Sequence, residues 1–205
     1  MNSILIATDI FGVTPHINEL AVRYTKQFNQ PIVVVDPYDG AVQQFENEAQ
    51  AYQQYLTAGG LEQYALKVDN ALKTMTGDIL IIGFSAGASA AYSCTKLNDD
   101  SQRLKHFIGF YPSQIRNQLD ITPNHKVSLI FPISEPHFYL SACIDTLSKK
   151  KNVHCYQTPY HHGFINPLSK NYSPTAANYF CQQLVEIVDL NDVATLITQE
   201  QQHFV

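Results

Sequence analysis

Ser85 lies in the segment Gly-Phe-Ser-Ala-Gly at positions 83–87, with a glycine two residues before it and two residues after it. The apolar run Ile79 to Ile82 precedes this segment, and a stretch of small residues, 88–91, follows it. The pattern is typical of a nucleophile elbow, in which a serine at a sharp strand-to-helix turn exposes its hydroxyl above a sheet. The bland alternative is an ordinary tight turn between a strand and a helix. In a chain with 12 serines and 9 glycines, chance predicts about 0.02 such matches.

A serine hydroxyl is a weak nucleophile, so it needs a base within hydrogen-bond reach and a third group that orients the base. Glu135 is the first acid after the apolar run 127–131, and His161 and His162 follow the run 153–157. We predict His162 as the base, with His161 as the alternative or as a surface histidine, and Glu135 as the acid. The resulting chain order of serine, acid and histidine is the order found in α/β-hydrolases.

Further candidates lie close to these residues along the chain. His137 is two residues from Glu135 and is a candidate for lining the site. A tetrahedral intermediate needs N–H donors, and the backbone N–H of Ala86 directly follows the nucleophile. The second donor is expected in the loop after the first strand, around Ile10 and Phe11. Metal-binding patterns such as H-E-x-x-H are absent from the sequence, so we predict no metal.

Short apolar runs alternate with amphipathic segments along the whole chain. The predicted strands are 3–8, 31–36, 79–83, 107–111, 127–131 and 153–157. The predicted helices are 15–28, 42–57, 61–75, 86–97 and 136–147, with a last helix that starts at Ser173 and Pro174 and a tail from about 191. This alternation predicts one α/β domain over residues 1–205, a parallel sheet with helices on both faces and a ligand at the carboxyl ends of the strands. The helix at 42–57 is a candidate either for covering the site or for plain core packing.

The composition is typical of a soluble globular protein. The chain has 205 residues, 45% of them hydrophobic and 15% charged, with a net charge of -5. A mildly acidic chain without a basic stripe is a poor nucleic-acid binder. The apolar runs are far shorter than the roughly 20 residues of a membrane span, and the N-terminus resembles a strand rather than a signal peptide. The four cysteines match no metal or redox motif, so we expect reduced, buried thiols, a cytoplasmic location and no cofactor.

Several segments of this chain resemble the dienelactone hydrolase family. They are 9–17, 33–38, 83–87, 162–164 and 172–174 with the helix after it. The resemblance covers about residues 3–188. It implies an α/β-hydrolase fold with Ser85 as nucleophile, His162 as base and Ile10 as the second oxyanion donor. Because the chain begins at the strand that carries the oxyanion loop, we expect a truncated fold of six strands in the order 2-1-3-4-5-6.

The chain differs from that family at several of the matching positions. Dienelactone hydrolases use a cysteine nucleophile where this chain has Ser85, and they usually carry glutamate beside it, where this chain has Asp9. Pro132 and Glu135 stand where the family usually has a glycine-bearing strand end and an aspartate, and Asn166 stands where an arginine is expected. We therefore expect a substrate other than a dienelactone.

These observations together predict a serine hydrolase that cleaves a small ester or lactone through an acyl-enzyme. Asp9, Phe11, His137 and His161 are the predicted pocket residues around the catalytic ones. Two alternatives stay open, namely a non-catalytic binding protein of the same fold, and a thioesterase or amidase that uses the same triad. We expect neither nucleic acid nor membrane as a partner, and the sequence predicts no particular oligomeric state.

Overall fold

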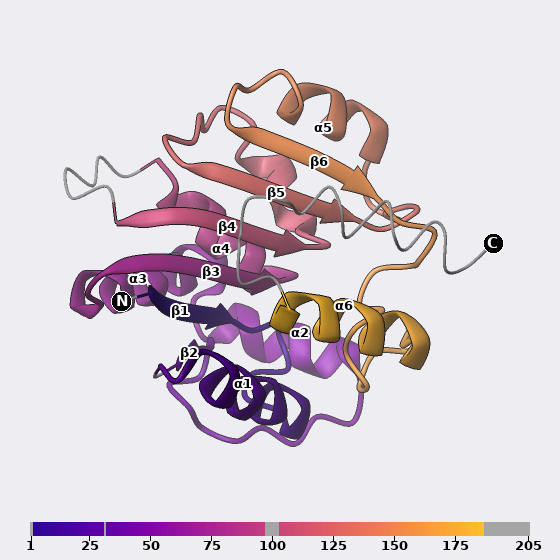
Figure 1. Cartoon of the computed structure of the whole chain (residues 1–205). Coiled ribbons are helices and arrows are strands. Elements are labelled where there is room, and N and C mark those ends of the chain that lie inside the picture. Colours follow the sequence, from indigo (N-terminus) through magenta and orange to yellow (C-terminus); the bar gives the residue numbers. More distant parts are fainter. Residues whose placement is uncertain (1, 31, 97–102, 187–205) are drawn as a thin grey trace.

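A computed structural model describes residues 2–30, 32–96 and 103–186 of the chain (Figure 1). Within these residues, six parallel strands form one sheet in the order β2-β1-β3-β4-β5-β6, which confirms the predicted order. The strands are β1 (Asn2–Ala7), β2 (Ile32–Val35), β3 (Asp78–Phe84), β4 (Leu104–Phe110), β5 (Lys126–Phe131) and β6 (Val153–Gln157).

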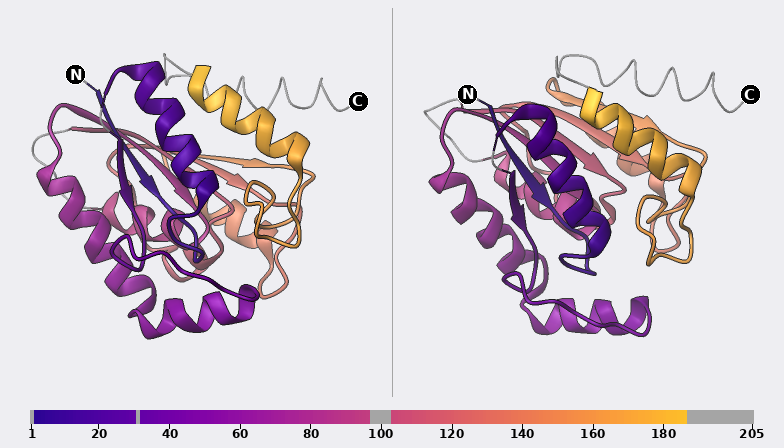
Figure 2. Two further views of the ribbon diagram at one scale, coloured as in Figure 1. Left: turned by 90° about the horizontal axis from the view of Figure 1, so that it is seen from below. Right: turned by 60° about the horizontal axis from the view of Figure 1, so that its bottom comes forward.

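Helices cover both faces of this sheet, as Figures 1 and 2 show. The helices α1 (Pro15–Phe28) and α6 (Pro174–Glu186) lie on one face. The helices α3 (Gly60–Thr74), α4 (Ala86–Cys94) and α5 (Leu140–Leu147) lie on the other, with the short 3₁₀ helix η1 (Ser113–Asn117). The helix α2 (Glu48–Thr57) lies beyond the carboxyl ends of β1 and β2, where it contacts α3 and buries Tyr55 in the core on that face (Figure 2).

The register of the strands brings their carboxyl ends to one edge of the sheet. Ala7 pairs with both Val35 and Gly83, and Phe131 pairs with Gln157. The chain therefore leaves β1, β2, β3, β5 and β6 along the same edge, where ligands of open parallel sheets bind. Side chains that follow these strands are brought together although they are far apart in the sequence.

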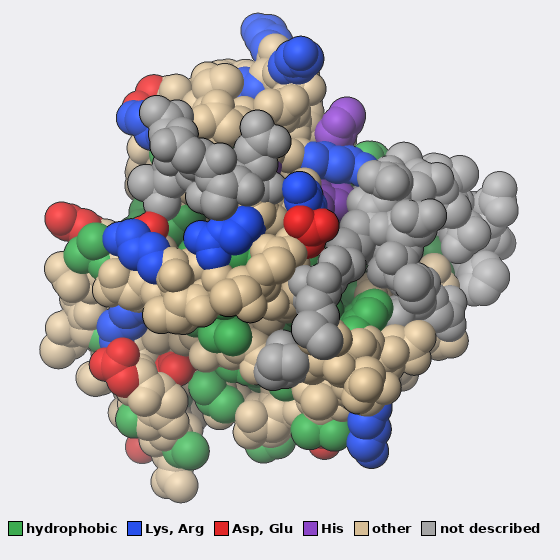
Figure 3. Space-filling view, turned by 60° about the vertical axis from the view of Figure 1, so that its left-hand side comes forward, with side chains coloured by type: hydrophobic (Ala, Val, Ile, Leu, Met, Phe, Trp, Pro, Cys, Tyr) green, Lys and Arg blue, Asp and Glu red, His purple; other side chains and the backbone are tan. Residues whose placement is uncertain are grey.

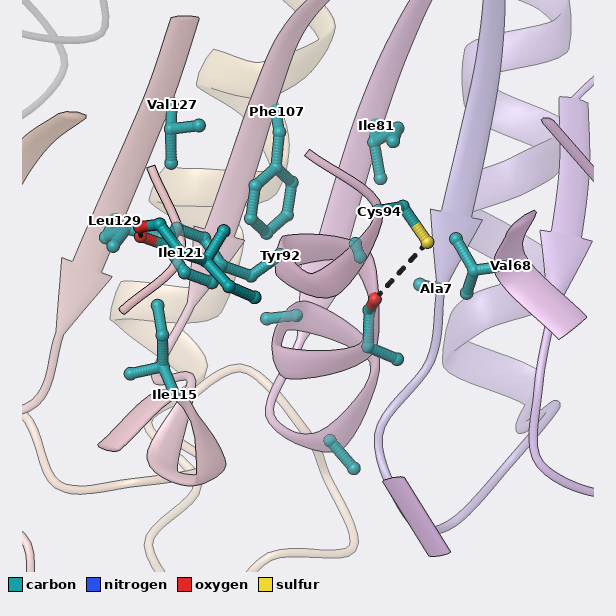
Figure 4. Packing of buried hydrophobic residues seen from close by; sticks show 14 of the residues in the cluster. Ala7, Val68, Ile81, Tyr92, Cys94, Phe107, Ile115, Ile121, Val127 and Leu129 are labelled. Carbon is teal, nitrogen blue, oxygen red and sulfur yellow. Dashed lines mark hydrogen bonds between the residues drawn. The ribbon is translucent and has the colours of Figure 1, made fainter. Parts of the chain in front are cut away.

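The core on the α3 and α4 face is built around large buried side chains (Figure 4). Tyr92 of α4 is completely buried beside Ile121 and Leu129, and its hydroxyl donates to the Ile121 carbonyl at 3.2 Å. Cys94 lies at the other side of α4, next to Val68 of α3, and its thiol donates to the carbonyl of Ala90 at 3.5 Å. Burial of such side chains contributes about 1.5–3 kcal/mol each, which holds α4 firmly against the sheet.

The predicted starts of α1 and α6 are confirmed, because both begin with a hydroxyl cap followed by proline. The Thr14 hydroxyl accepts the Ile17 N–H at 3.3 Å, and Pro15 is the first residue of α1. The Ser173 hydroxyl accepts the Ala176 N–H at 3.3 Å before α6. Such side chains satisfy N–H groups that the first helical turn leaves without partners.

The predicted helix at 42–57 is wrong in its first turns, because α2 begins only at Glu48. The side chain of Asn47 accepts the Gln50 N–H at 2.9 Å and caps the helix there. The preceding segment instead places the Phe45 ring 6.4 Å from the Phe11 ring and 5.8 Å from the Tyr38 ring. These aromatic contacts with two loops of the sheet edge override the helical spacing of apolar residues in the sequence.

Two other predicted helices are shorter in the structure. The helix α5 begins at Leu140 rather than at Pro136, and the segment that leads to it is tied to the histidine loop, where the Ile133 N–H donates to the Tyr160 carbonyl at 2.7 Å. The helix α4 ends at Cys94, where the Thr95 hydroxyl and N–H both donate to the Tyr92 carbonyl. The predicted loop at 98–101 and the tail from 191 lie outside the described residues.

The side on which the strands begin carries basic and acidic side chains next to one another (Figure 3). One such ion pair joins the starts of two strands, since the Lys105 Nζ of β4 lies 3.4 Å from the Asp78 Oδ1 of β3. Within the described residues, every helix is too short or too polar to cross a lipid bilayer.

Candidate active site

The turn between β3 and α4 carries Ser85 in a strained backbone conformation. Its φ of 49° and ψ of -112° lie in a region that non-glycine residues rarely adopt. A Cβ on Gly87 would lie 2.2 Å from the Thr8 carbonyl oxygen, and a Cβ on Gly83 would lie 2.6 Å from the Ala88 Cα. Both positions therefore require glycine, which gives the physical reason for the spacing seen in the sequence.

The side chains of Ser85, His162 and Glu135 form a continuous hydrogen-bonded chain. The Ser85 Oγ lies 2.9 Å from the His162 Nε2, and the His162 Nδ1 lies 2.7 Å from the Glu135 Oε1. The Glu135 side chain is 4% exposed and the His162 side chain 27% exposed. When the Nδ1–H donates a hydrogen bond to the carboxylate, Nε2 carries no proton and can accept one from the hydroxyl.

The segment after β5 holds Glu135 beside the histidine loop. The Ile133 N–H donates to the Tyr160 carbonyl, and the Gln157 side-chain amide donates to the Ile133 carbonyl at 3.0 Å. Both bonds tie the segment after β5 to the strand and loop that lead to His162. The backbone that carries the Glu135 carboxylate is thus fixed to the backbone that carries His162.

His162 is positioned by one contact to its backbone and one to its ring. The Asn171 side-chain amide donates to the His162 carbonyl at 2.9 Å, and the Tyr111 ring centroid lies 5.0 Å from the imidazole. Gly163 directly after it has a φ of 83°, and a Cβ there would lie 2.4 Å from the Ser169 Oγ. The turn that presents the imidazole therefore requires a glycine at this position.

The loop after β1 fixes two successive peptide groups. The Asp9 carbonyl accepts the Thr8 hydroxyl at 3.0 Å and the Gly12 N–H at 3.2 Å. The Phe11 N–H donates to the Asp9 Oδ1 at 2.9 Å. Since C=O and N–H point in opposite directions in a trans peptide, these bonds also set the direction of the Ile10 N–H.

Two backbone N–H groups at this edge are free to bind an anion. In the described part of the chain, the N–H of Ile10 and the N–H of Ala86 donate to no other backbone or side-chain group. Ala86 is the first residue of α4, where an N–H has no partner within the helix and the helix dipole is positive.

Comparisons with known proteins identify the family and the fold of this chain. Residues 1–189 match the model of the dienelactone hydrolase family. The chain belongs to the dienelactone hydrolase family. This bears out the resemblance seen in the sequence and shows that the protein belongs to a family of hydrolases.

One sequence relative of this dienelactone hydrolase family member is the uncharacterized protein YczH of Bacillus subtilis strain 168. It is 29% identical over 168 residues, which are 80% of this chain and 81% of that protein. Among solved structures, alpha/beta hydrolase domain-containing protein 10 from mouse matches with a TM-score of 0.62 and 9% identity, over 93% of this chain and 90% of that one. Est1E from Butyrivibrio proteoclasticus, solved with ferulic acid, matches with a TM-score of 0.55 and 11% identity, over 91% and 89% of the two chains. These likenesses show an α/β-hydrolase fold.

A buried polar contact joins the loop after β1 to the loop after β6 in this dienelactone hydrolase family member. The Asn166 Nδ2 donates to the Asp9 Oδ2 at 2.5 Å, and Asp9 is only 7% exposed. Burial raises the pKa of Asp9, and the hydrogen bonds from Asn166 and Phe11 and the nearby His162 oppose this rise only in part. Sequence reasoning noted Asp9 and Asn166 separately but did not predict their contact.

The remaining predicted pocket residues divide into two groups. Phe11 is buried at the sheet edge, where its ring packs against the Phe45 ring. His137 and His161 are exposed, and within the described residues no hydrogen bond joins either of them to Ser85. The structure thus places His162, and not His161, beside the serine.

Sequence reasoning missed two aromatic residues at this edge. Tyr111, with its ring against His162, directly follows β4 and has a φ of 40°. Tyr38 follows β2, and its hydroxyl donates to the Ile10 carbonyl at 2.6 Å. Their signal was their place at the carboxyl end of a predicted strand, since Tyr111 is the last residue of the predicted strand 107–111 and Tyr38 lies two residues after the predicted strand 31–36. Over the described residues, no three histidine, cysteine, aspartate or glutamate side chains gather as a metal site.

Proposed function

We propose that this dienelactone hydrolase family member is a serine hydrolase that cleaves a small ester or lactone through an acyl-enzyme. The observation that carries the proposal is the chain from the Ser85 Oγ through His162 to Glu135, with distances of 2.9 and 2.7 Å. A nucleophile, a base and a group that orients the base are the parts that hydroxyl catalysis requires. Their presence at the carboxyl edge of the sheet supports a role in acyl transfer.

In the proposed first half-reaction, the Ser85 hydroxyl attacks the substrate carbonyl carbon. The hydroxyl proton passes to the His162 Nε2, and the Glu135 carboxylate stabilises the imidazolium that forms. His162 then donates the proton to the leaving alkoxide as the bond between carbonyl carbon and oxygen breaks. The product is an acyl-enzyme on Ser85, and with a lactone the freed hydroxyl stays attached to the acyl group.

In the second half-reaction, water takes the place of the alcohol. His162 removes a proton from the water, which attacks the acyl carbon, and then returns the proton to the Ser85 oxygen. A carboxylic acid leaves and the free hydroxyl is restored. Atoms balance over the cycle, since one water is consumed for each ester bond that is broken.

The free N–H groups of Ile10 and Ala86 support this assignment, because both tetrahedral intermediates carry a negative oxygen. Donors that are already oriented stabilise this charge without reorganisation during the reaction. Loss of one such donor typically costs about 2.7–4 kcal/mol of transition-state stabilisation. The positive end of the α4 dipole acts in the same direction.

The test compares the wild-type protein with Ser85→Ala and with Ser141→Ala, an exposed serine of α5. We expect Ser85→Ala to lower the hydrolysis of p-nitrophenyl butyrate by about 10³-fold or more. Ser141→Ala should leave this rate unchanged, and a fluorophosphonate probe should label the wild type and Ser141→Ala but not Ser85→Ala. Equal rates and equal labelling in all three proteins would refute the proposal and favour a non-catalytic binding protein. Matched thioester and amide substrates test which acyl bond is preferred.

A further inference from the structure

Tyr38 connects the loop after β2 to the loop after β1. Its hydroxyl donates to the Ile10 carbonyl at 2.6 Å, and the residue is 8% exposed. The distance is at the short end for an O–H donor and a carbonyl acceptor. The Ile10 carbonyl belongs to the Ile10–Phe11 peptide. The peptide before it, Asp9–Ile10, carries the Ile10 N–H that is the proposed oxyanion donor.

The turn after β2 places Tyr38 by means of one buried carboxylate. The Asp36 Oδ1 accepts the Tyr38 N–H at 2.7 Å, and the Asp36 Oδ2 accepts the Gly40 N–H at 2.7 Å. Asp36 is itself buried. The two hydrogen bonds that this carboxylate accepts fix the turn, so the tyrosine ring leaves the backbone in a defined direction.

The ring of Tyr38 also contacts two neighbouring groups. A Cβ on Gly12 would lie 2.9 Å from the Tyr38 Cδ2, so the ring lies directly against the backbone of the β1 loop. The Phe45 ring packs against Tyr38 with a centroid distance of 5.8 Å. The hydroxyl is thus carried by a rigid ring that cannot withdraw from the loop without losing these contacts.

Both peptide groups next to Ile10 are fixed by hydrogen bonds. The peptide before it is held at the Asp9 carbonyl by the Thr8 hydroxyl and the Gly12 N–H. The peptide after it is held at the Ile10 carbonyl by the Tyr38 hydroxyl and at the Phe11 N–H by the Asp9 side chain. In these two peptides the Ile10 N–H alone, among described contacts, has no partner.

The hydroxyl of Tyr38 keeps its proton over the ordinary working range of pH. Burial raises the pKa of Tyr38 well above its usual value, and the nearby Asp9 and Asp36 carboxyls raise it further. Tyr38 therefore acts as a hydrogen-bond donor toward the Ile10 carbonyl at any pH at which the protein is assayed.

We propose that Tyr38 is a positioning residue that holds the β1 loop so that the Ile10 N–H points at the developing oxyanion. This proposal rests on the proposed serine hydrolase function. Without the hydroxyl, the Ile10 carbonyl loses its donor and the backbone on the carboxyl side of the N–H can rotate. Small displacements of an oriented group are enough to lower catalysis by about 10²-fold.

The experiment compares Tyr38→Phe with Tyr92→Phe, which also removes a buried hydroxyl that donates to a backbone carbonyl but lies in the core. For each protein, kcat/KM is measured with an oxoester and with the thionoester of the same acid and alcohol. Sulfur is a weak acceptor, so the thionoester gains little from the oxyanion N–H groups. We expect Tyr38→Phe to lower the oxoester rate about 10- to 100-fold and the thionoester rate much less.

The ratio of the two rates separates positioning from a merely structural role. Urea unfolding compares the stability of Tyr92→Phe with that of Tyr38→Phe. Tyr92→Phe should keep the wild-type ratio of the oxoester rate to the thionoester rate. Placing 4-aminophenylalanine at position 38 restores a donor on the same ring, and it should return the ratio toward the wild-type value even where Tyr38→Phe folds poorly. An active wild type with an unchanged ratio in Tyr38→Phe would overturn this proposal alone. An inactive wild type that no fluorophosphonate labels would instead overturn the proposed function.

Discussion

Replacing Glu135 by glutamine changes the charge beside His162 and leaves the size of the side chain almost unchanged. In the wild type, the carboxylate lies 2.7 Å from the His162 Nδ1 with its side chain 4% exposed. In the proposed mechanism, His162 takes the serine proton as the bond to the substrate forms, so its ion pair with Glu135 stabilises the transition state. The substitution should therefore lower kcat and kcat/KM together.

The size of the effect follows from this distance. At 2.7 Å and an effective dielectric constant of about 20, two unit charges attract by roughly 6 kcal/mol. Since about 1.4 kcal/mol corresponds to a factor of ten, full loss of the pair would lower the rate by about 10⁴-fold. A glutamine N–H facing Nδ1 would also favour the tautomer in which Nε2 carries a proton and cannot accept one.

The assay is steady-state hydrolysis of p-nitrophenyl butyrate by Glu135→Gln, the wild type and Asp145→Asn. Asp145 is an exposed carboxylate of α5 and serves as the matched control, so its variant should keep the wild-type kcat and KM. Urea unfolding shows that each variant is folded under the conditions of the assay. A folded Glu135→Gln protein that loses less than about tenfold in kcat would refute the reasoning, because the ion pair would then contribute little to the transition state.

Two further predictions concern stability. Gly87→Ala should destabilise the fold by about 1–3 kcal/mol in urea unfolding, since the added Cβ would lie 2.2 Å from the Thr8 carbonyl oxygen. In the control Gly40→Ala the added Cβ meets open space, so this variant should lose only the stability that its left-handed backbone strain costs. Equal losses of stability in the two variants would contradict this reasoning. Burial lowers the pKa of His16 below its ordinary 6.5, so the unfolded chain binds more protons and wild-type stability should fall as the pH drops from about 6.5 toward the folded-state pKa. His16→Gln should lose less stability between about pH 7.5 and 5, and identical pH profiles would contradict this reasoning.

Local patterns in the sequence determined the parts of this protein that depend on short-range geometry. The glycines at 83 and 87 predicted the elbow because a Cβ at either position meets backbone directly. Thr14 with Pro15 predicted the start of α1 because a cap acts within one helical turn. The alternation of apolar runs and amphipathic segments predicted six parallel strands, since a parallel strand requires a crossover connection, and the resemblance to the dienelactone hydrolase family implied their order.

Contacts between distant segments were decided only by the tertiary structure. The Asn166 amide reaches Asp9 across 157 residues, and Phe45 leaves the predicted helix to pack between two loops. The sequence predicted His162 as the base with His161 as the alternative, and only the place where the loop after β6 meets the sheet edge shows which imidazole lies beside Ser85. Local spacing carries no information about which loops meet, because strand register and the packing of helices on the two faces set the distances between loops.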